Sequence, residues 1–377
     1  MKKLYWCVQH VDEMGGAEMV SIDLMNHLVD NYDITCIATA EITKPLCYEI
    51  DKRIKVVSLN IPKTVTRFDD YANKYRLKHK YFHVIGLALK SFYYYFLRKG
   101  HYRRYISKLI SQDEGKIICS SADNYLYCPK KHYAIFHYHF NSVKFFSWSE
   151  QALLKMSRKP DEYVFLSKST LDLVVAKKKK LKDKSSYIFN PVRYEPTLNT
   201  TYNKNRILFL GRYADQKNPL LALEVAKELK QQGLSFSLDM FGKGALENKM
   251  REFIKENNLE DNVSINDVTM DVRGELLKSD LLLFTSKYEG FGLVKIEANA
   301  CSRPVITSNW GDTVYDVTED GKDGYVINSV NPKDFANKII EILSNKETLA
   351  KLKETSYKQS YKFAYSNIIP SWIKLLG

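Results

Sequence analysis

Short apolar runs alternate with helical patterns along most of this chain, and that alternation restricts the folds it can adopt. We expect strands at 4–8, 34–39, 56–59, 116–120, 133–139 and 163–166, and a first helix at 17–29. A second series of strands follows at 206–210, 236–240, 263–265, 281–285 and 304–307. Strands that alternate with helices form parallel sheets, so the sequence predicts an α/β protein.

Residues 190–205 separate the two series, and their prolines and asparagines are typical of a linker. We therefore expect an N-terminal domain at 1–190 and a C-terminal domain at 200–358. Two successive α/β domains create a cleft, and open parallel sheets bind ligands at the carboxyl ends of their strands.

The formal net charge of +13 is uneven, because residues 1–190 hold 32 Lys and Arg against 19 Asp and Glu. An anionic membrane surface, a nucleic acid or a charged substrate would suit this excess, and a solvated surface of lysines would explain it equally. No apolar run reaches the roughly 18 residues of a membrane span, and the chain starts like a strand rather than a secretory signal. The six cysteines lack a C-x-x-C pair, so we expect a cytoplasmic protein without structural zinc.

Two glycines, Gly15 and Gly16, stand where the first strand turns into the first helix. Glycines let the backbone approach a ligand, and a helix N-terminus offers N–H groups to an anion. A tight turn without a ligand would use the same residues, so the rest of the sequence has to decide.

The second domain places cations at the matching position. Gly211 and Arg212 follow its first strand, and Lys217 stands just before the next helix. A diphosphate leaving group gains negative charge as its bond breaks, and a guanidinium, an ammonium and helix N–H groups stabilise that charge. The alternative is a pair of solvated surface cations.

The run from Ser286 to Ala298 carries two carboxylates on one strand–turn–helix unit. The strand at 281–285 ends in a turn with Glu289, Gly290 and Gly292, and a helix begins near Gly292 with Glu297 on about its second turn. Both carboxylates then point into one pocket, where they accept hydrogen bonds from vicinal hydroxyls of a hexose or a ribose. A helix N-terminus alone would explain Glu289, but not the whole run.

This run resembles the E-x7-E motif of retaining glycosyltransferases with the GT-B fold, in particular family 4 of the bacterial surface-polysaccharide type. The Gly15-Gly16 loop, the Gly211-Arg212 element with Lys217, and Phe241-Gly242-Lys243-Gly244 fit the same pattern, which covers nearly the whole chain. The resemblance implies two Rossmann-like domains with a cleft between them. The first would bind the acceptor, the second would bind a nucleotide sugar, and the last helix, about 360–377, would cross back to the first.

The resemblance also implies a role for each motif residue. Arg212 and Lys217 would hold the donor diphosphate, beside Gly16 and Gly211. Glu289 would contact the donor sugar and Glu297 the ribose hydroxyls. The remaining donor-site positions are Gly290, Phe291, Gly292 and Leu293, and the acceptor-site positions are Gly15 and Gly16. The implied donor is a nucleotide sugar, commonly a UDP-hexose, and the anomeric configuration would be retained.

His137 and His139 alternate onto one face of a strand end. Their segment is similar to a tryptophan–acid–His–Phe–Asn run of bacterial polysaccharide transferases, which aligns His139 with the family's active-site histidine. The catalytic set would then be His139, Glu289, Arg212 and Lys217, with His137 in place of the usual tryptophan. A structural role is the alternative reading of a strand histidine.

The sequence contains no D-x-D triplet and no histidine, cysteine and carboxylate cluster with metal spacing, so we expect no metal and no cofactor beside the nucleotide-sugar substrate. Residues 67–108 interleave cations with aromatic residues. That pattern suits an anionic membrane surface, where a lipid-linked saccharide would be the acceptor, and it also suits the core of two packed helices.

Three other function classes remain open. A catalytically silent GT-B partner subunit would keep the fold but has little reason to keep both glutamates and both cations. A nucleotide-sugar epimerase shares the architecture but does not need the E-x7-E run. A nucleic-acid binder would explain the basic half, but no recognised nucleic-acid module accompanies it, so we expect no nucleic-acid partner.

Overall fold

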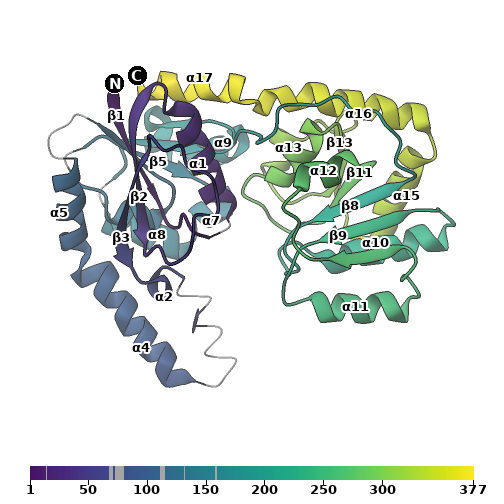
Figure 1. Cartoon of the computed structure of the whole chain (residues 1–377), viewed down its shortest axis with the longest axis horizontal. Coiled ribbons are helices and arrows are strands. Elements are labelled where there is room, and N and C mark those ends of the chain that lie inside the picture. Colours follow the sequence, from purple (N-terminus) through teal and green to yellow (C-terminus); the bar gives the residue numbers. More distant parts are fainter. Residues whose placement is uncertain (14, 68–70, 73–79, 111–114, 131, 158) are drawn as a thin grey trace. The chain divides into compact units, whose positions relative to one another are not determined.

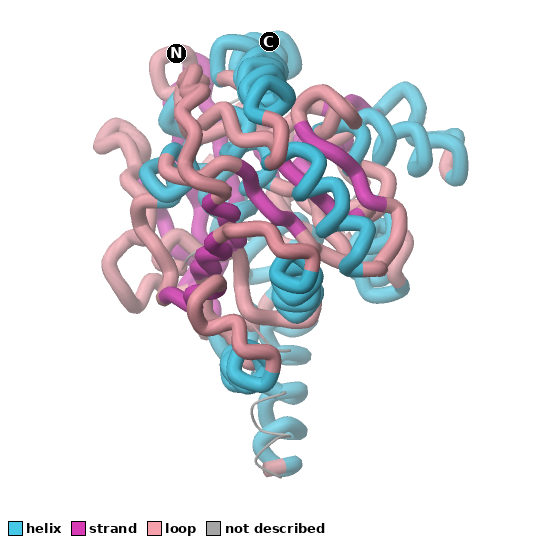
Figure 2. The backbone as a smooth tube through the Cα atoms, turned by 90° about the vertical axis from the view of Figure 1, so that its right-hand side faces the viewer, coloured by secondary structure: helices cyan, strands magenta, loops and turns pink. Residues whose placement is uncertain are grey.

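The computed structural model describes residues 1–13, 15–67, 71–72, 80–110, 115–130, 132–157 and 159–377. The chain divides into two compact units. The first comprises Met1–Leu166, Thr170–Phe189 and Ile369–Gly377, and the second comprises Ser167–Ser169 and Asn190–Ile368. The α/β class is confirmed, because each unit contains a parallel sheet flanked by helices (Figures 1 and 2).

The sheet of the first unit has seven described strands in the order β3-β2-β1-β4-β5-β6-β7. Their bounds are β1 (Lys2–Val8), β2 (Tyr32–Ala40), β3 (Lys55–Ile61), β4 (Lys116–Cys119), β5 (Ala134–Tyr138), β6 (Glu162–Phe165) and β7 (Ser185–Tyr187). Trp6 in the middle of β1 pairs with Cys36 on one side and Ile118 on the other. The strand order reverses between β1 and β4, so the loop after β1 lies at a topological switch point, where such sheets bind ligands.

The first six strands were expected, and β7 was not. Its three residues are Ser185, Ser186 and Tyr187, at the edge of the sheet and only partly buried or exposed. A short polar edge strand has no apolar run to mark it in the sequence.

The helices of the first unit follow the strands. They are α1 (Gly16–Leu28), α2 (Lys63–Thr66), α4 (Tyr81–Phe92), the π-helical turn η1 (Tyr93–Leu97), α5 (Lys99–Leu109), α6 (Ala122–Leu126), α7 (Ser142–Phe145), α8 (Trp148–Met156), α9 (Lys168–Lys177) and the 3-10 turn η2 (Lys179–Lys184). Ser121, Asn141 and Ser147 cap α6, α7 and α8 by accepting backbone N–H bonds. Such capping satisfies amides that the first turn of a helix leaves unpaired.

The expected final helix is in fact interrupted. The helix α16 (Lys346–Ser360) is followed by the 3-10 turn η3 (Tyr361–Phe363) and then by α17 (Tyr365–Leu376). The chain joins the first unit from Ile369 onward. There Trp372 of α17 is fully buried, with its ring 5.4 Å from Trp6 and 4.9 Å from His137.

The sheet of the second unit has six described strands in the order β10-β9-β8-β11-β12-β13. They are β8 (Arg206–Leu210), β9 (Ser237–Phe241), β10 (Val263–Asn266), β11 (Leu281–Phe284), β12 (Val305–Ser308) and β13 (Gly324–Ile327), of which β13 was not expected. The helices are α10 (Pro219–Gln231), α11 (Glu247–Glu256), α12 (Val272–Leu277), α13 (Leu293–Ala300), α14 (Val314–Val317), α15 (Pro332–Leu343) and α16. The order reverses between β8 and β11, so the loops after these two strands meet at the switch point.

The basic aromatic segment falls only partly within the described residues, which leave out 68–70 and 73–79. In the described part, α4 extends away from the sheet of its unit (Figures 1 and 2). Apolar side chains of α4 and η1 form an exposed stripe of Phe82 (88% exposed), Ile85 (57%), Leu89 (66%), Phe92 (52%) and Phe96 (44%). The reading of this segment as packed core is therefore wrong for the stripe, whereas Tyr102 and Ile106 of α5 do belong to the core.

No helix in the described part of the chain combines the length and the apolar character that a membrane span requires.

Candidate active site

The loops after β8 and β9 approach each other so closely that only glycine fits. The N–H of Gly211 donates to the carbonyl oxygen of Phe241 at 3.1 Å, and the N–H of Tyr213 donates to that of Lys243 at 3.1 Å. A Cβ on Gly242 would lie 2.0 Å from the carbonyl oxygen of Gly211, and one on Gly244 would lie 2.3 Å from that of Tyr213. The Phe241–Gly244 motif therefore shapes the loop that carries Arg212 and Lys217.

Lys217 and Glu289 are brought together from the loops after β8 and β11. Lys217 Nζ lies 2.5 Å from Glu289 Oε1, and the two side chains are only 16% and 9% exposed. The same ammonium lies 5.3 Å from the ring centroid of Phe284. Thr285 links the two loops, because its hydroxyl donates to the backbone carbonyl oxygens of Lys217 and Asn218 at 3.1 and 2.9 Å.

Arg212 is exposed, and its guanidinium is held from one side. Its Nη2 donates to Oε1 of Gln216 at 2.9 Å. The remaining guanidinium nitrogens suit bidentate contact with a phosphate, which is the geometry that arginine favours.

The E-x7-E run folds as expected. Gly292 has a φ of 82° and caps α13, and a Cβ there would lie 3.1 Å from the ring of Trp310. Glu289 and Glu297 are 8% and 6% exposed, and Phe291 is buried with its ring 5.8 Å from Phe363. Gly290 and Leu293 are partly exposed between them.

Tyr194 is a neighbour of Glu297 that the sequence did not indicate. Burial, and then the negative charge of Glu297, raise the pKa of the Tyr194 phenol to about 12. The guanidinium of Arg273 lies 6.0 Å from the Tyr194 ring. Tyr194 lies in the linker segment, where no periodic pattern marks a buried side chain.

In the first unit, the Gly15-Gly16 loop is held by Tyr48. The N–H of Gly15 donates to the Tyr48 hydroxyl at 3.1 Å, and that hydroxyl lies 3.3 Å from the Gly15 carbonyl oxygen. Glu18 occupies the helix N-terminus, since a Cβ on Gly15 would lie 2.2 Å from its Oε2. The carboxyl group of Glu18, whose pKa is raised by burial, therefore lies where we expected α1 to offer free N–H groups to an anion.

A buried charged group lies beside this loop. Lys63 Nζ lies 2.7 Å from Asp12 Oδ2 and 3.3 Å from Glu13 Oε1. His10 is 6% exposed, and neither ring nitrogen has a hydrogen-bond partner among the described residues. Burial is the main cause that lowers the pKa of His10. His10, Asp12 and Glu13 follow β1 and Lys63 begins α2, and the sequence did not single them out.

His139 follows directly on β5 and is 8% exposed. Its ring centroid lies 4.1 Å from that of His137, and its Nε2 has no hydrogen-bond partner among the described residues. Burial lowers the pKa of His139 to about 3, so the imidazole is neutral at physiological pH. His137 is 1% exposed and packs between Trp6 and Trp372, which indicates a structural role.

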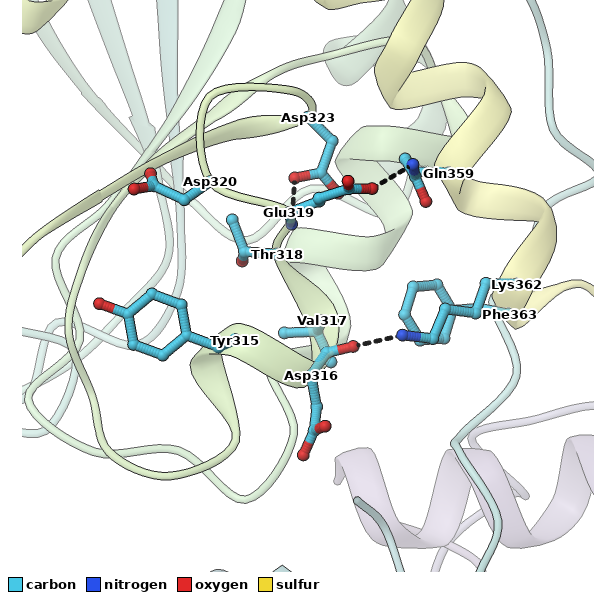
Figure 3. A pocket seen from close by; sticks show the side chains of 10 residues that line it. All are labelled: Tyr315, Asp316, Val317, Thr318, Glu319, Asp320, Asp323, Gln359, Lys362 and Phe363. Atoms are coloured by element: carbon cyan, nitrogen blue, oxygen red, sulfur yellow. Dashed lines mark hydrogen bonds between the residues drawn. The ribbon is translucent and has the colours of Figure 1, made fainter. Parts of the chain in front are cut away.

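The second unit also contains a cavity of about 300 Å³ that none of the predicted site residues lines (Figure 3). Its wall includes Glu319 and Asp323 from the loop after α14, Gln359 from the end of α16 and Lys362 from η3. Asp323 pairs with the buried Lys295 at 2.7 Å, and Lys362 Nζ donates to the carbonyl oxygen of Asp316 at 2.8 Å. The first contact joins the loop to α13, the second joins η3 to α14, and Gln359 Nε2 of α16 donates to Glu319 Oε2, so the cavity belongs to the packing of these elements.

The described residues contain no group of three or more histidines, cysteines and carboxylates placed to hold a metal ion.

Comparisons with known proteins relate the second unit to a protein family. Residues 194–359 match the family model of glycosyl transferases group 1. The matched residues cover most of the second unit, which is therefore similar to the domain of this family. It contains the Lys217–Glu289 pair, both loops of the switch point and the E-x7-E run.

Relatives extend the likeness beyond this domain. The chain is 29% identical over 175 residues, 46% of its length, to the poly(glycerol-phosphate) alpha-glucosyltransferase of Bacillus subtilis. That match and those with two further curated relatives span only 26% to 52% of the relative's own length. Over 96% of this chain and 95% of the relative, it is 25% identical to the Campylobacter jejuni GalNAc-alpha-(1->4)-GalNAc-alpha-(1->3)-diNAcBac-PP-undecaprenol alpha-1,4-N-acetyl-D-galactosaminyltransferase.

Solved structures confirm the fold. The Staphylococcus aureus protein TarM, crystallised with Fondaparinux, alpha-GlcNAc-glycerol and UDP, superimposes with a TM-score of 0.76 at 17% identity, over 100% of both chains. The GT-B fold class is thereby confirmed.

Proposed function

We propose that this chain is a retaining glycosyltransferase that moves a hexose or N-acetylhexosamine from a UDP-sugar to a hydroxyl of a lipid-linked saccharide, in the synthesis of a surface polysaccharide. The observation that carries the proposal is the Lys217–Glu289 pair. It joins a cation and a carboxylate at the carboxyl ends of β8 and β11. The names of the relatives, which include a glucosyltransferase and an undecaprenol-linked acceptor, support the substrate classes.

The pair suggests how the donor binds. The diphosphate would replace Glu289 as the partner of Lys217 Nζ, with Arg212 as a second cation. The released Glu289 carboxylate would then accept hydrogen bonds from the sugar, and Glu297 from the ribose. Cations fixed by surrounding contacts stabilise charge that develops on a leaving group without a cost of reorganisation.

In the proposed reaction, the acceptor oxygen bonds to the anomeric carbon on the face that the diphosphate leaves. The bond between that carbon and the diphosphate oxygen breaks, and a donor phosphate oxygen takes the acceptor's proton. The products are UDP and the new glycoside. His139 is neutral at physiological pH, so we propose that it hydrogen-bonds the donor sugar rather than transferring a proton.

We also propose that turnover needs no metal ion, because Arg212 and Lys217 supply the positive charge at the diphosphate. Under this proposal no cofactor beside the nucleotide sugar takes part.

The donor site is tested by calorimetric titration of UDP and a panel of UDP-sugars. Lys217→Met removes one charge-assisted contact worth about 2–3 kcal/mol, so we expect UDP to bind roughly 30- to 150-fold more weakly. Lys278→Met is the matched control, because Lys278 also pairs with a glutamate in this unit but is 67% exposed. Equal UDP affinity of wild type and Lys217→Met would contradict the assignment.

We further propose that the first unit docks on an anionic membrane through α4 and α5. The exposed stripe from Phe82 to Phe96 offers apolar side chains of the kind that enter the headgroup region. Residues 71–112 contain ten Lys and Arg and no Asp or Glu, which suits an anionic surface. Arg104 and Lys108 are exposed on α5, whereas Arg103 is partly buried and its Nε donates to the carbonyl oxygen of Leu126.

Sedimentation with liposomes tests the docking. Each cation near an anionic surface contributes about 1 kcal/mol, so Arg104→Gln with Lys108→Gln should weaken binding to phosphatidylglycerol vesicles by about 30-fold. Phe82→Ser with Leu89→Ser should weaken it at any salt concentration. Lys278→Gln is the control. Binding that none of these changes affects would remove the docking proposal and leave the transferase proposal intact.

A further inference from the structure

Gln216 lies between Arg212 and Lys217, and the function proposed above gives it no role. Both ends of its side-chain amide have partners. Oε1 accepts a hydrogen bond from Arg212 Nη2 at 2.9 Å, and Nε2 donates to the carbonyl oxygen of Tyr288 at 3.1 Å. The carbonyl oxygen of Gln216 itself accepts from the N–H of Lys287 at 2.9 Å. One residue therefore links the guanidinium and the loop after β11.

The contacts around Gln216 join the same two loops. Asp215 Oδ1 lies 2.6 Å from Lys287 Nζ, on one side of Gln216 in the sequence. The Lys217–Glu289 pair lies on the other side. Tyr288 directly precedes Glu289, so the bond from Gln216 Nε2 holds the residue next to the carboxylate assigned to the sugar.

We infer that Gln216 is a positioning residue that couples occupation of the diphosphate site to the placement of Glu289 at the donor sugar. This inference rests on the proposed function. The amide accepts from the diphosphate side and donates to the sugar side, so a movement of Arg212 toward a diphosphate is transmitted to Tyr288. This coupling requires no direct contact between Arg212 and Glu289.

The chemistry of the amide makes the inference testable. Gln216→Glu retains an acceptor for Arg212 but replaces the N–H donor with a carboxylate oxygen facing the Tyr288 carbonyl oxygen. The link to Arg212 is kept and the link to Tyr288 is lost. Gln216→Leu has a similar size and loses both links.

Hydrogen–deuterium exchange of the ligand-free protein tests the link itself. The segment 285–292 should exchange severalfold faster in Gln216→Glu and Gln216→Leu than in wild type. Gln232→Leu is the control, since Gln232 lies at the opposite end of α10 from the loop after β8 and its amide donates at 3.1 Å to Asn337. Exchange of 285–292 that stays at the wild-type rate in both Gln216 variants would overturn the inference, whether or not the protein is a transferase.

Kinetics with the preferred donor tests the coupling. For Gln216→Glu we expect the Kd of UDP to stay within about threefold of wild type and kcat to fall about tenfold, the effect of one hydrogen bond. Gln216→Leu should raise the Kd of UDP and lower kcat. A weaker UDP affinity with unchanged kcat in Gln216→Glu would overturn the inference, because the residue would then act only on the diphosphate. A wild type without turnover on any donor would instead refute the proposed function.

Discussion

The buried His139 should make the first unit sensitive to acid. Its ordinary pKa is 6.5, and burial lowers the pKa in the folded protein to about 3. Between these values the unfolded chain binds the proton and the folded protein does not, so stability is lost as pH falls below 6.5. From pH 7.5 to pH 5.0 this single group should cost about 2 kcal/mol, since each unit of pKa difference is worth about 1.4 kcal/mol.

Urea unfolding at the two pH values measures this effect through tryptophan fluorescence. Trp6 and Trp372 pack near the histidines and report on the first unit. His139→Gln cannot titrate, so it should lose about 2 kcal/mol less than wild type between pH 7.5 and 5.0, whatever its stability at pH 7.5. Burial also lowers the pKa of His137, so the stability of the His139→Gln variant still depends on pH to some extent.

The exposed His27 on α1 is the control, and His27→Gln should behave like wild type. An equal loss in wild type and His139→Gln would refute the reasoning, because His139 would then accept a proton in the folded state. It would also remove the basis for assigning it a neutral role at the donor sugar.

Two further changes probe the second unit. Gly242→Ala places a methyl group 2.0 Å from the carbonyl oxygen of Gly211, so it should displace the loop after β8 and weaken UDP binding at least tenfold. Gly233→Ala is the control: Gly233 has a positive φ but open space around it, so this change should affect thermal stability and leave UDP binding unchanged. Lys353→Met leaves Asp280 without the fully buried ammonium 2.7 Å away, so it should lower the free energy of unfolding by about 3–5 kcal/mol, measured by urea titration. A loss below about 1 kcal/mol would show that the backbone N–H groups of Asn203 and Asn205 stabilise the Asp280 carboxylate without Lys353.

The sequence was informative where an apolar run or a glycine marks a backbone constraint. The strands β1 to β6 and β8 to β12, and the turn at Gly292, follow from patterns that the backbone geometry requires. The edge strand β7 escaped because its residues Ser185, Ser186 and Tyr187 form no apolar run. The edge strand β13 does contain apolar residues, Tyr325 to Ile327, but the run is only three residues long. The sequence could not distinguish the exposed stripe from Phe82 to Phe96 from a buried helix face, since apolar residues have the same helical spacing in both.

The site was predictable in its members but not in its contacts. Arg212, Lys217 and Glu289 were expected near a ligand. The pairing of Lys217 with Glu289 and of Arg212 with Gln216 depends on side-chain rotamers in the ligand-free state, which the sequence does not show. Gln216 and Tyr194 gave no signal of their own, because their neighbours come from distant segments. Glu18 was visible in the sequence, but only the structure shows its carboxyl group against Gly15.

The central claim is sugar transfer that depends on the Lys217–Glu289 pair. The most direct test incubates the purified protein with a panel of nucleotide sugars and EDTA, and measures nucleoside diphosphate release with and without a lipid-linked saccharide. The account predicts release from one UDP-sugar, stimulated by the saccharide and abolished by Glu289→Ala or Lys217→Ala. Absence of release and of binding for every donor would contradict it and favour a catalytically silent subunit.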